Sequence, residues 1–263
     1  MFLFIPALIF IFGLIIGSFL NVLILRLHSG ESVAAGRSKC PQCGQILAWF
    51  DLVPVLSYVF LGGRCRYCSK KISCQYPSVE LATGLLFATA YLINFNRLGS
   101  LALADFGFWL LLLRDWLAIA ALIVIFVYDW RWLIIPDAVV LPALVLVAVF
   151  NLGLGLSPAS LLIGLAVGLG FFAAQYFVSK GRWVGGGDLR LGALLGVLLG
   201  WPVIMVALLL SYIIGALAAL ALLAAKKVQV KSAVPFGVFL APAALIALFW
   251  GPQIVAWYLG RLN

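Results

Sequence analysis

The sequence predicts an all-α polytopic membrane protein, with about eight transmembrane helices and one small polar module between the first two. Three observations lead to this class. Of the 263 residues, 66% are hydrophobic and only 10% are charged. Several apolar runs reach or approach the ~18 residues that cross a bilayer core of about 30 Å. The short alternating strands of a membrane barrel are not visible in the sequence.

The apolar runs place the helices roughly at 2–25, 78–96, 106–128, 133–153, 158–179, 188–200, 202–225 and 235–259. We expect the first run to be a retained helix, because Lys and Arg are absent before Arg26 and no small-residue cleavage site follows. The sixth run is short, and Gly200-Trp201-Pro202 separates it from the seventh, so one broken seventh helix is the alternative. The chain then divides into a first helix at 1–25, a polar module at 26–76 and a helical region at 77–263.

The net charge of +9 predicts how the chain is oriented in the membrane. Seven basic residues lie between the first two helices: Arg26, Arg37, Lys39, Arg64, Arg66, Lys70 and Lys71. The positive-inside rule places this segment in the cytoplasm. Alternation of eight helices puts the loops at 129–137, 179–187 and 226–231 on the same side and both termini outside. Topology explains the basic residues, and no motif indicates binding to nucleic acid.

The polar module contains all five cysteines of the chain. Two Cys-x-x-Cys pairs, Cys40/Cys43 and Cys65/Cys68, are separated by 21 residues. This spacing is typical of a tetrahedral zinc site. Four thiolates leave no open position on the ion, so the expected zinc is structural and substitutes for a larger core. A metal-free or redox pair of turns is the alternative, and Cys74 receives no role.

Three of the eight acidic residues lie at predicted cytoplasmic helix ends: Asp129, Asp137 and Asp188. A carboxylate at the edge of a membrane helix is costly to desolvate, which indicates a functional site. Asp188 follows three glycines and precedes an apolar run, so helix capping would also explain it. Capping explains Asp137 as well, because it follows a proline at a helix start. Asp115 adjoins Arg114 toward the outer side, where we expect an ion pair.

Asp129 and Asp188 together suit the hydrolysis of a peptide bond. One ionised carboxylate takes a proton from water, while a second, protonated one polarises the carbonyl group and later protonates the leaving amine. Two carboxylates a few Å apart titrate as a pair, which maintains this state. Gly185, Gly186 and Gly187 would leave room for an extended substrate backbone. Other protease chemistries lack support, because the sequence has one histidine, His28, and neither an HExxH nor a GxSxG motif.

The chain resembles the type IV prepilin peptidases, the bifunctional leader peptidase/N-methyltransferases of bacterial pilus and type II secretion systems. The resemblance covers nearly the whole sequence, and the order of the motifs makes it specific. The matching segments are GSFLNV at 17–22, SKCPQCG at 38–44, DLVPVLSY at 51–58, GGRCRYC at 62–68, YPSVEL at 76–81, the segment 129–137 with IPD at its end, and GGGD at 185–188.

This resemblance implies an activity and a location. The family cuts a short basic leader from prepilins and pseudopilins at the cytoplasmic face of the bacterial inner membrane, just after a glycine. It then methylates the new N-terminal residue with S-adenosylmethionine. Asp129 and Asp188 match the two catalytic aspartates, within a peptidase domain at 77–263. Asp137 matches a third acid, which we assign with the three glycines to substrate binding.

The resemblance also implies a methyltransferase region around the module at 26–76. The four cysteines match the zinc-type members of the family, and Gly63 and Glu80 are expected to contribute to the S-adenosylmethionine site. No Rossmann-type glycine fingerprint is present, so spacing does not indicate the methyl donor site. Some enzymes that the chain resembles cut without methylating, so a peptidase without methylation is an alternative. A proton- or cation-coupled transporter also uses membrane carboxylates, although no internal repeat is visible. A non-catalytic envelope scaffold that docks through its zinc knuckles is the third alternative.

Overall fold

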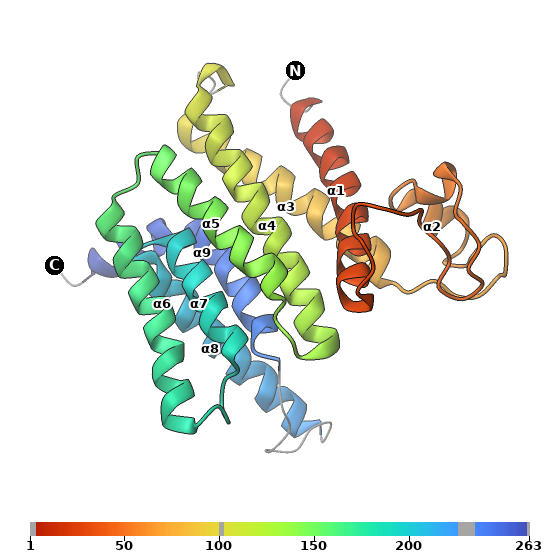
Figure 1. The fold of residues 1–263 in the computed structure, drawn as a ribbon. Helices are drawn as coiled ribbons and strands as arrows, with labels where there is room; N and C mark the ends of the chain where they lie inside the picture. Colours follow the sequence, from red (N-terminus) through yellow and green to blue (C-terminus); the bar gives the residue numbers. More distant parts are fainter. Residues whose placement is uncertain (1–3, 100–102, 226–234, 262–263) are drawn as a thin grey trace. The chain divides into compact units, whose positions relative to one another are not determined.

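The computed structural model describes residues 4–99, 103–225 and 235–261, and most of them lie in helices (Figure 1). The predicted basic loop at 226–231 lies outside the described residues. The chain divides into two compact units, Met1–Ala104 and Asp105–Asn263.

In the first unit, helix α1 (Phe4–Ser29) packs along α3 (Gln75–Leu98), as Figure 1 shows. Small residues four positions apart allow this close approach. A Cβ atom added to Gly13 would lie 2.7 Å from the Cα of Gly84, and one added to Gly17 would lie 2.7 Å from the Cα of Glu80. The two helices therefore hold the ends of the polar module at a fixed spacing.

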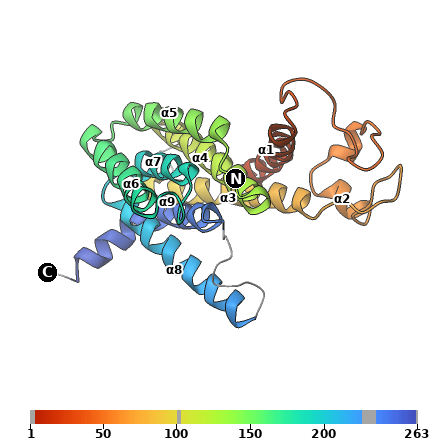
Figure 2. The same cartoon turned by 60° about the horizontal axis from the view of Figure 1, so that its bottom comes forward.

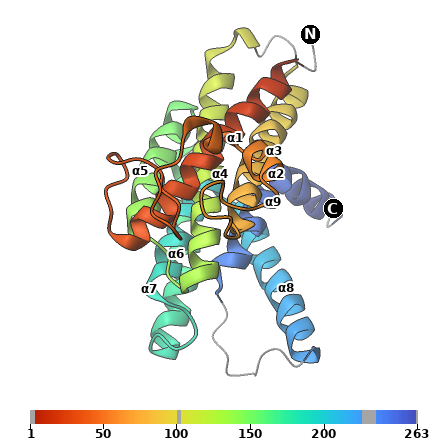
Figure 3. The same cartoon turned by 90° about the vertical axis from the view of Figure 1, so that its right-hand side faces the viewer.

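The polar module contains a short 3-10 helix, η1 (Trp49–Leu52), and the short helix α2 (Leu56–Phe60), joined by irregular segments (Figure 3). Asp51 connects its two halves. The Asp51 carboxylate accepts hydrogen bonds from Arg66 Nε at 2.8 Å and from the Tyr67 hydroxyl at 2.9 Å, and the backbone N–H of Ala48 donates to it at 3.2 Å. Burial alone would raise the pKa of Asp51, but these hydrogen bonds outweigh it and lower the pKa below its usual range.

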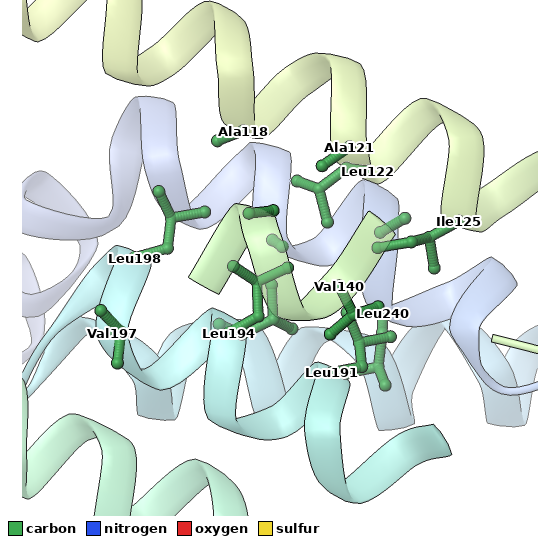
Figure 4. Close-up of a cluster of buried hydrophobic side chains, with 14 of the residues drawn as sticks. Ala118, Ala121, Leu122, Ile125, Val140, Leu191, Leu194, Val197, Leu198 and Leu240 are labelled. Carbon is green, nitrogen blue, oxygen red and sulfur yellow. The ribbon is translucent and has the colours of Figure 1, made fainter. Parts of the chain in front are cut away.

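The described part of the second unit consists of six helices with α7 at its centre: α4 (Phe106–Trp132), α5 (Asp137–Gly153), α6 (Pro158–Ser179), α7 (Gly186–Leu199), α8 (Val203–Ala224) and α9 (Gly237–Leu259). Leu191 and Leu194 of α7 are buried among side chains that include Ile125 of α4, Val140 of α5 and Leu240 of α9 (Figure 4). A helix that is apolar on most sides is stable only when it is surrounded, and α7 meets that condition.

Helices α6 and α7 lie side by side (Figure 2), and their backbones approach each other at glycines. Gly164 and Gly168 of α6 lie against Gly196 and Gly192 of α7, and a side chain at any of these positions would overlap the opposite backbone. The small-xxx-small spacing on both helices is the pattern that brings membrane helices together. This contact fixes α7, and with it the start of α7 where Asp188 lies.

All eight predicted helices are present as separate helices. Among the described helices, six are long and apolar enough to cross a membrane: α1, α3, α4, α6, α8 and α9. Helix α5 is a shorter apolar helix of 17 residues, and α7 has 14 residues. Because α7 ends at Leu199 and α8 begins at Val203, the sixth and seventh predicted segments are two helices.

Several helix ends differ from the predicted limits, and the differences in α4 and α7 change where the aspartates lie. Helix α4 continues to Trp132, so Asp129 belongs to its last turn and not to a loop. Leu133 ends α4 in the left-handed conformation with φ 55°, and Pro136 then delays the start of α5 to Asp137. Helix α7 begins at Gly186, which puts Asp188 in its first turn. The apolar runs stop short of the polar turns at the end of α4 and the start of α7, whereas the apolar segment at 133–136 is not helical.

A buried polar network connects α4, α5 and α7. Arg114 forms the predicted ion pair with Asp115 at 2.5 Å. Arg114 Nη1 also donates to Asn151 Oδ1 at 2.9 Å, and Asn151 Nδ2 donates to the carbonyl oxygen of Val197 at 2.7 Å. The network lies about 21 Å along α4 from Asp129. Its groups satisfy one another, as buried polar groups must.

Candidate active site

Asp129 lies in the last turn of α4 and is buried, with an exposed fraction of 4%. Its Oδ2 accepts a hydrogen bond from the backbone N–H of Val238 at 3.3 Å, and the backbone N–H of Gly237 also bonds to the carboxylate. Both donors belong to the first turn of α9, where N–H groups have no partner inside the helix. The start of α9 therefore stabilises a carboxylate that an apolar environment alone would disfavour.

Asp188 lies in the first turn of α7 and is also buried, with an exposed fraction of 9%. Its Oδ2 accepts a hydrogen bond from the backbone N–H of Gly185 at 2.8 Å. Asp188 is therefore a helix-capping residue, as the alternative interpretation required. Because this hydrogen bond occupies Oδ2, capping leaves Oδ1 available for chemistry.

The fold brings the two aspartates together. Their carboxylates lie near enough to interact electrostatically, although the two residues are 59 positions apart in the sequence. Tyr212 of α8 lies within electrostatic range of Asp188, and its hydroxyl donates to Gln175 Oε1 of α6 at 2.7 Å. Two buried carboxylates from different helices, with helix starts at both, form a site that suits paired acid–base chemistry.

The three glycines before Asp188 have different surroundings. A Cβ atom added to Gly187 would lie 2.8 Å from the Cβ of Ile135, in the segment between α4 and α5. Gly186 is exposed, and a Cβ atom there would meet nothing within 4 Å. Gly185 is exposed too, and its φ of −87° is ordinary for any residue. Only Gly187 is required by packing inside the protein.

Asp137, at the first position of α5, forms an ion pair with Arg190 of α7. Both side chains are 47% exposed, so the pair is a surface contact. It joins the start of α5 to a residue two positions after Asp188. Asp137 thus has a partner of its own, separate from the backbone donors that bind the two buried aspartates.

The four predicted zinc ligands form a cluster. The Sγ atoms of Cys40, Cys43, Cys65 and Cys68 all lie within 4.8 Å of one another. Zn–S bonds of about 2.3 Å in a tetrahedron require sulfur–sulfur distances of about 3.8 Å, so this donor set fits a zinc ion. Cys40 and Cys65 are buried, with exposed fractions of 5% each.

The two cysteine turns have the same backbone design. In each, the N–H four residues after the first cysteine donates to that cysteine's carbonyl at 2.9 Å, from Gly44 to Cys40 and from Ser69 to Cys65. Gly44 and Ser69 are both left-handed, with φ of 71° and 57°. Burial raises the pKa of Cys40, but backbone N–H groups and neighbouring thiols lower it to about 7. A thiol that ionises near neutral pH is ready to bind a metal.

Gly63 and Glu80 both lie against the segment at 55–58. Gly63 has φ of 68°, and a Cβ atom there would lie 2.9 Å from the hydroxyl oxygen of Tyr58. Glu80 is buried, with an exposed fraction of 7%, and its Oε2 accepts a hydrogen bond from the backbone N–H of Val55 at 2.7 Å. Among the described residues, none of the ion pairs includes Glu80.

Gly237 and Val238 were missed by the sequence analysis, although they contact Asp129 directly. Pro235-Phe236-Gly237 before an apolar run indicated a helix start. That pattern contains no acid, histidine or cysteine, and the contact joins positions more than a hundred residues apart. Sequence alone therefore offered a helix boundary here but no reason to link it to a site.

Two family models match the chain. The model described as the bacterial peptidase A24 N-terminal domain matches residues 11–94, and the type IV leader peptidase family model matches residues 116–220. A prepilin leader peptidase/N-methyltransferase of Aeromonas salmonicida (strain A449) is 32% identical, across 97% of this chain and 94% of its own length. The chain belongs to the type IV leader peptidase family. The family members of that same name in Bacillus subtilis (strain 168) and Pseudomonas putida are 33% and 34% identical, across 96% and 94% of this chain and 97% and 91% of their own lengths.

No solved structure matches this leader peptidase family member. The family match at 116–220 contains both Asp129 and Asp188, and the N-terminal match at 11–94 contains the four-cysteine cluster. The gap between the two matches includes the division between the two compact units. Family membership and the helical fold confirm the predicted resemblance and the all-α membrane class.

Proposed function

We propose that this chain removes the basic leader of prepilins or pseudopilins at the cytoplasmic face of the bacterial inner membrane, using Asp129 and Asp188. It then methylates the new N-terminal residue. The relatives at 32–34% identity carry the name prepilin leader peptidase/N-methyltransferase. The observation that carries the proposal is the pair of buried carboxylates, brought within electrostatic reach by α4 and α7.

The pair supplies a general base and a general acid to one water molecule. The ionised carboxylate takes a proton from water as the oxygen attacks the scissile carbonyl carbon. The protonated carboxylic acid hydrogen-bonds to the carbonyl oxygen, and a proton is delivered to the leaving nitrogen as the carbon–nitrogen bond breaks. The products are a carboxylic acid on the leader and a free amine on the mature chain. Backbone donors at each aspartate favour its ionised form, and mutual repulsion keeps one proton on the pair.

The substrate backbone would pass beside the start of α7. Gly185 and Gly186 are exposed and leave space next to Asp188, whereas Gly187 is already in contact with Ile135. An extended strand presents its carbonyl groups, while a helix keeps them in internal hydrogen bonds. Asp137 and Arg190 lie at the same end of α5 and α7, where their charges can orient the polar part of a substrate.

The basic residues support a cytoplasmic position for this end of the second unit. Arg131 follows Asp129 by two positions, and Lys180 and Arg182 precede the glycines of α7. The first unit has its basic cluster in the module between α1 and α3. An excess of Lys and Arg in short loops marks the cytoplasmic side of a membrane protein. When the shorter helices α5 and α7 are counted with the six longer ones, eight crossings leave both termini outside.

We assign methyl transfer to the first unit, around the zinc module. When bound, S-adenosylmethionine supplies an activated methyl group for the new N-terminal amine. The donor is cationic, and a buried carboxylate without an ion-pair partner suits a cation. Among the described residues, Glu80 is such a carboxylate, so its position fits a cationic methyl donor. Gly63 would contribute through the backbone turn that it forms against Tyr58.

We assign zinc to the four cysteines as a structural ion. Four protein ligands complete its coordination, so it would hold the two cysteine turns together without entering either reaction. The module has few buried residues of its own, and a metal would supply the stability that a larger core gives to other domains.

The experiment uses the purified full chain in lipid bilayers, with a prepilin that carries its leader and with labelled S-adenosylmethionine. Mass spectrometry should find the leader cut from the mature chain, with label on the new N-terminus. Cleavage without label would make the chain a peptidase only. No cleavage under any lipid or pH condition would reject the peptidase and favour a transporter or a scaffold.

A further inference from the structure

We propose that Gly237 is a positioning residue for Asp129, and that the first turn of α9 sets the orientation of that carboxylate. The inference rests on the proposed function and adds a third element to the site. Asp129 comes from α4 and Asp188 from α7, whereas Gly237 comes from the start of α9. The residue lies beyond the stretch matched by the leader peptidase family model, which ends at 220.

The contact between Gly237 and Asp129 is direct. The backbone N–H groups of Gly237 and Val238 both bond to the Asp129 carboxylate, with the Val238 nitrogen 3.3 Å from Oδ2. Two donors from adjacent residues define the direction of a carboxylate better than one donor does. They also favour its ionised form, as the partial positive charge of a helix N-terminus does.

Space, and not backbone conformation, explains the glycine at position 237. Its backbone is helical, which any residue can adopt. Glycine is a poorer helix former than alanine, so its presence in α9 needs another reason. A Cβ atom at this position would lie 2.8 Å from Asp129 Oδ2 and 3.3 Å from its carboxyl carbon. Any larger residue would displace the carboxylate.

Aromatic contacts hold this first turn in place. The ring of Phe236 lies 5.0 Å from that of Tyr212 in α8 and 5.8 Å from that of Phe172 in α6, measured between ring centroids. Tyr212 is itself fixed by its hydrogen bond to Gln175. These contacts fix the start of α9 against α6 and α8. The N–H groups of its first turn are therefore held in place beside Asp129.

Gly251, in the same helix, provides a matched control. A Cβ atom at Gly251 would overlap the side chain of Val203 in α8, so alanine is crowded there as well. It lies about 21 Å along α9 from Gly237, in the second half of the helix. Gly251→Ala therefore reports the effect of crowding alone, without contact to Asp129.

The test measures leader cleavage by the full chain in lipid, together with the thermal unfolding midpoint of each variant. We expect Gly237→Ala to lower kcat by about ten- to a hundred-fold, because displacement of a catalytic group by about 1 Å has effects of this size. KM should stay near the wild-type value. Gly251→Ala should lower the midpoint at least as much while kcat stays near wild type.

Three results would overturn the inference: a wild-type kcat in Gly237→Ala, an equal loss of kcat in Gly251→Ala, or a rise in KM alone. If Gly237→Ala fails to fold, Phe236→Leu is tested in its place. This variant weakens the aromatic contacts of the first turn of α9 without crowding Asp129. A lower kcat with unchanged KM then supports the inference, and a wild-type kcat overturns it. Failure of the proposed function itself is distinguishable, because the wild-type chain would then cut no prepilin.

Discussion

Ile135 lies directly against Gly187, so closely that a Cβ atom on this glycine would come within 2.8 Å of the Ile135 Cβ. Ile135 belongs to the segment that follows Asp129, and Gly187 immediately precedes Asp188. The chain after one aspartate therefore packs on the residue before the other. This contact couples the positions of the two carboxylates, and one methyl group is enough to disturb it.

Gly187→Ala should impair both stability and cleavage. The added methyl group overpacks the contact with Ile135, which costs about 1–3 kcal/mol of unfolding free energy. It should also move Asp188 and lower kcat. Gly186→Ala is the control, because its methyl group enters open space. We expect it to keep the unfolding midpoint and kcat, and to raise KM if substrate passes there. Equal loss of kcat and stability in both variants would contradict this account of the motif.

Glu80→Gln should separate the two activities. The amide keeps the size of the side chain and can still accept from the Val55 N–H through its oxygen. It removes the negative charge that we assign to the methyl donor. We expect leader cleavage at the wild-type rate and loss of label transfer from S-adenosylmethionine. Normal methylation by Glu80→Gln would remove this residue from the donor site.

Replacement of a zinc ligand should release the metal. Cys40→Ser leaves three thiolates. The loss of one of four ligands should weaken zinc binding strongly. Metal analysis of the purified protein should show about one zinc per wild-type chain and a clear loss in the variant. Cys74→Ser is the matched control, since Cys74 lies outside the cluster and its Sγ is 3.3 Å from the Tyr58 hydroxyl. Equal zinc in the wild type and in Cys40→Ser would reject the site.

Asp51 should make the module sensitive to acid. Its hydrogen bonds lower its pKa in the folded protein, so its stabilising effect is complete above the unfolded pKa of about 3.9. That effect is lost as the pH falls further, through the folded pKa. The thermal midpoint of Asp51→Asn should therefore lie below that of the wild type at pH 6. The difference should shrink below about pH 4, and a difference that grows there would contradict the assignment.

The helices and the cysteine cluster could be predicted from sequence because their signals are local. An apolar run indicates a membrane helix, and a Cys-x-x-Cys pair indicates a metal-binding turn. Neither prediction requires knowledge of the rest of the fold. The end of α4 and the start of α5 were less predictable. Polar residues hide where helical hydrogen bonding stops, so Asp129 was expected in a loop and lies in the last turn of α4.

Contacts between distant segments could not be read from the sequence. Asp129 and Asp188 were paired because both are acids at one predicted face. Nothing in the sequence singled out Gly237, because a glycine has no reactive side chain. Its role depends on its contact with the Asp129 carboxylate, which only the structure shows. The same limit applies to Gly187. All three glycines before Asp188 look equivalent in the sequence, but only Gly187 lies against Ile135.

The most direct measurement is the rate of leader release by Asp129→Asn and Asp188→Asn in lipid, beside Asp137→Asn. The amides keep the shape of the side chains and remove the acid–base function. We expect each of the first two variants to lose about a hundred-fold or more in kcat. Asp137→Asn loses an exposed ion pair and a charge that we assign to substrate orientation, so it should keep most of its kcat and raise KM. A wild-type rate in either Asp129→Asn or Asp188→Asn would contradict the two-aspartate mechanism.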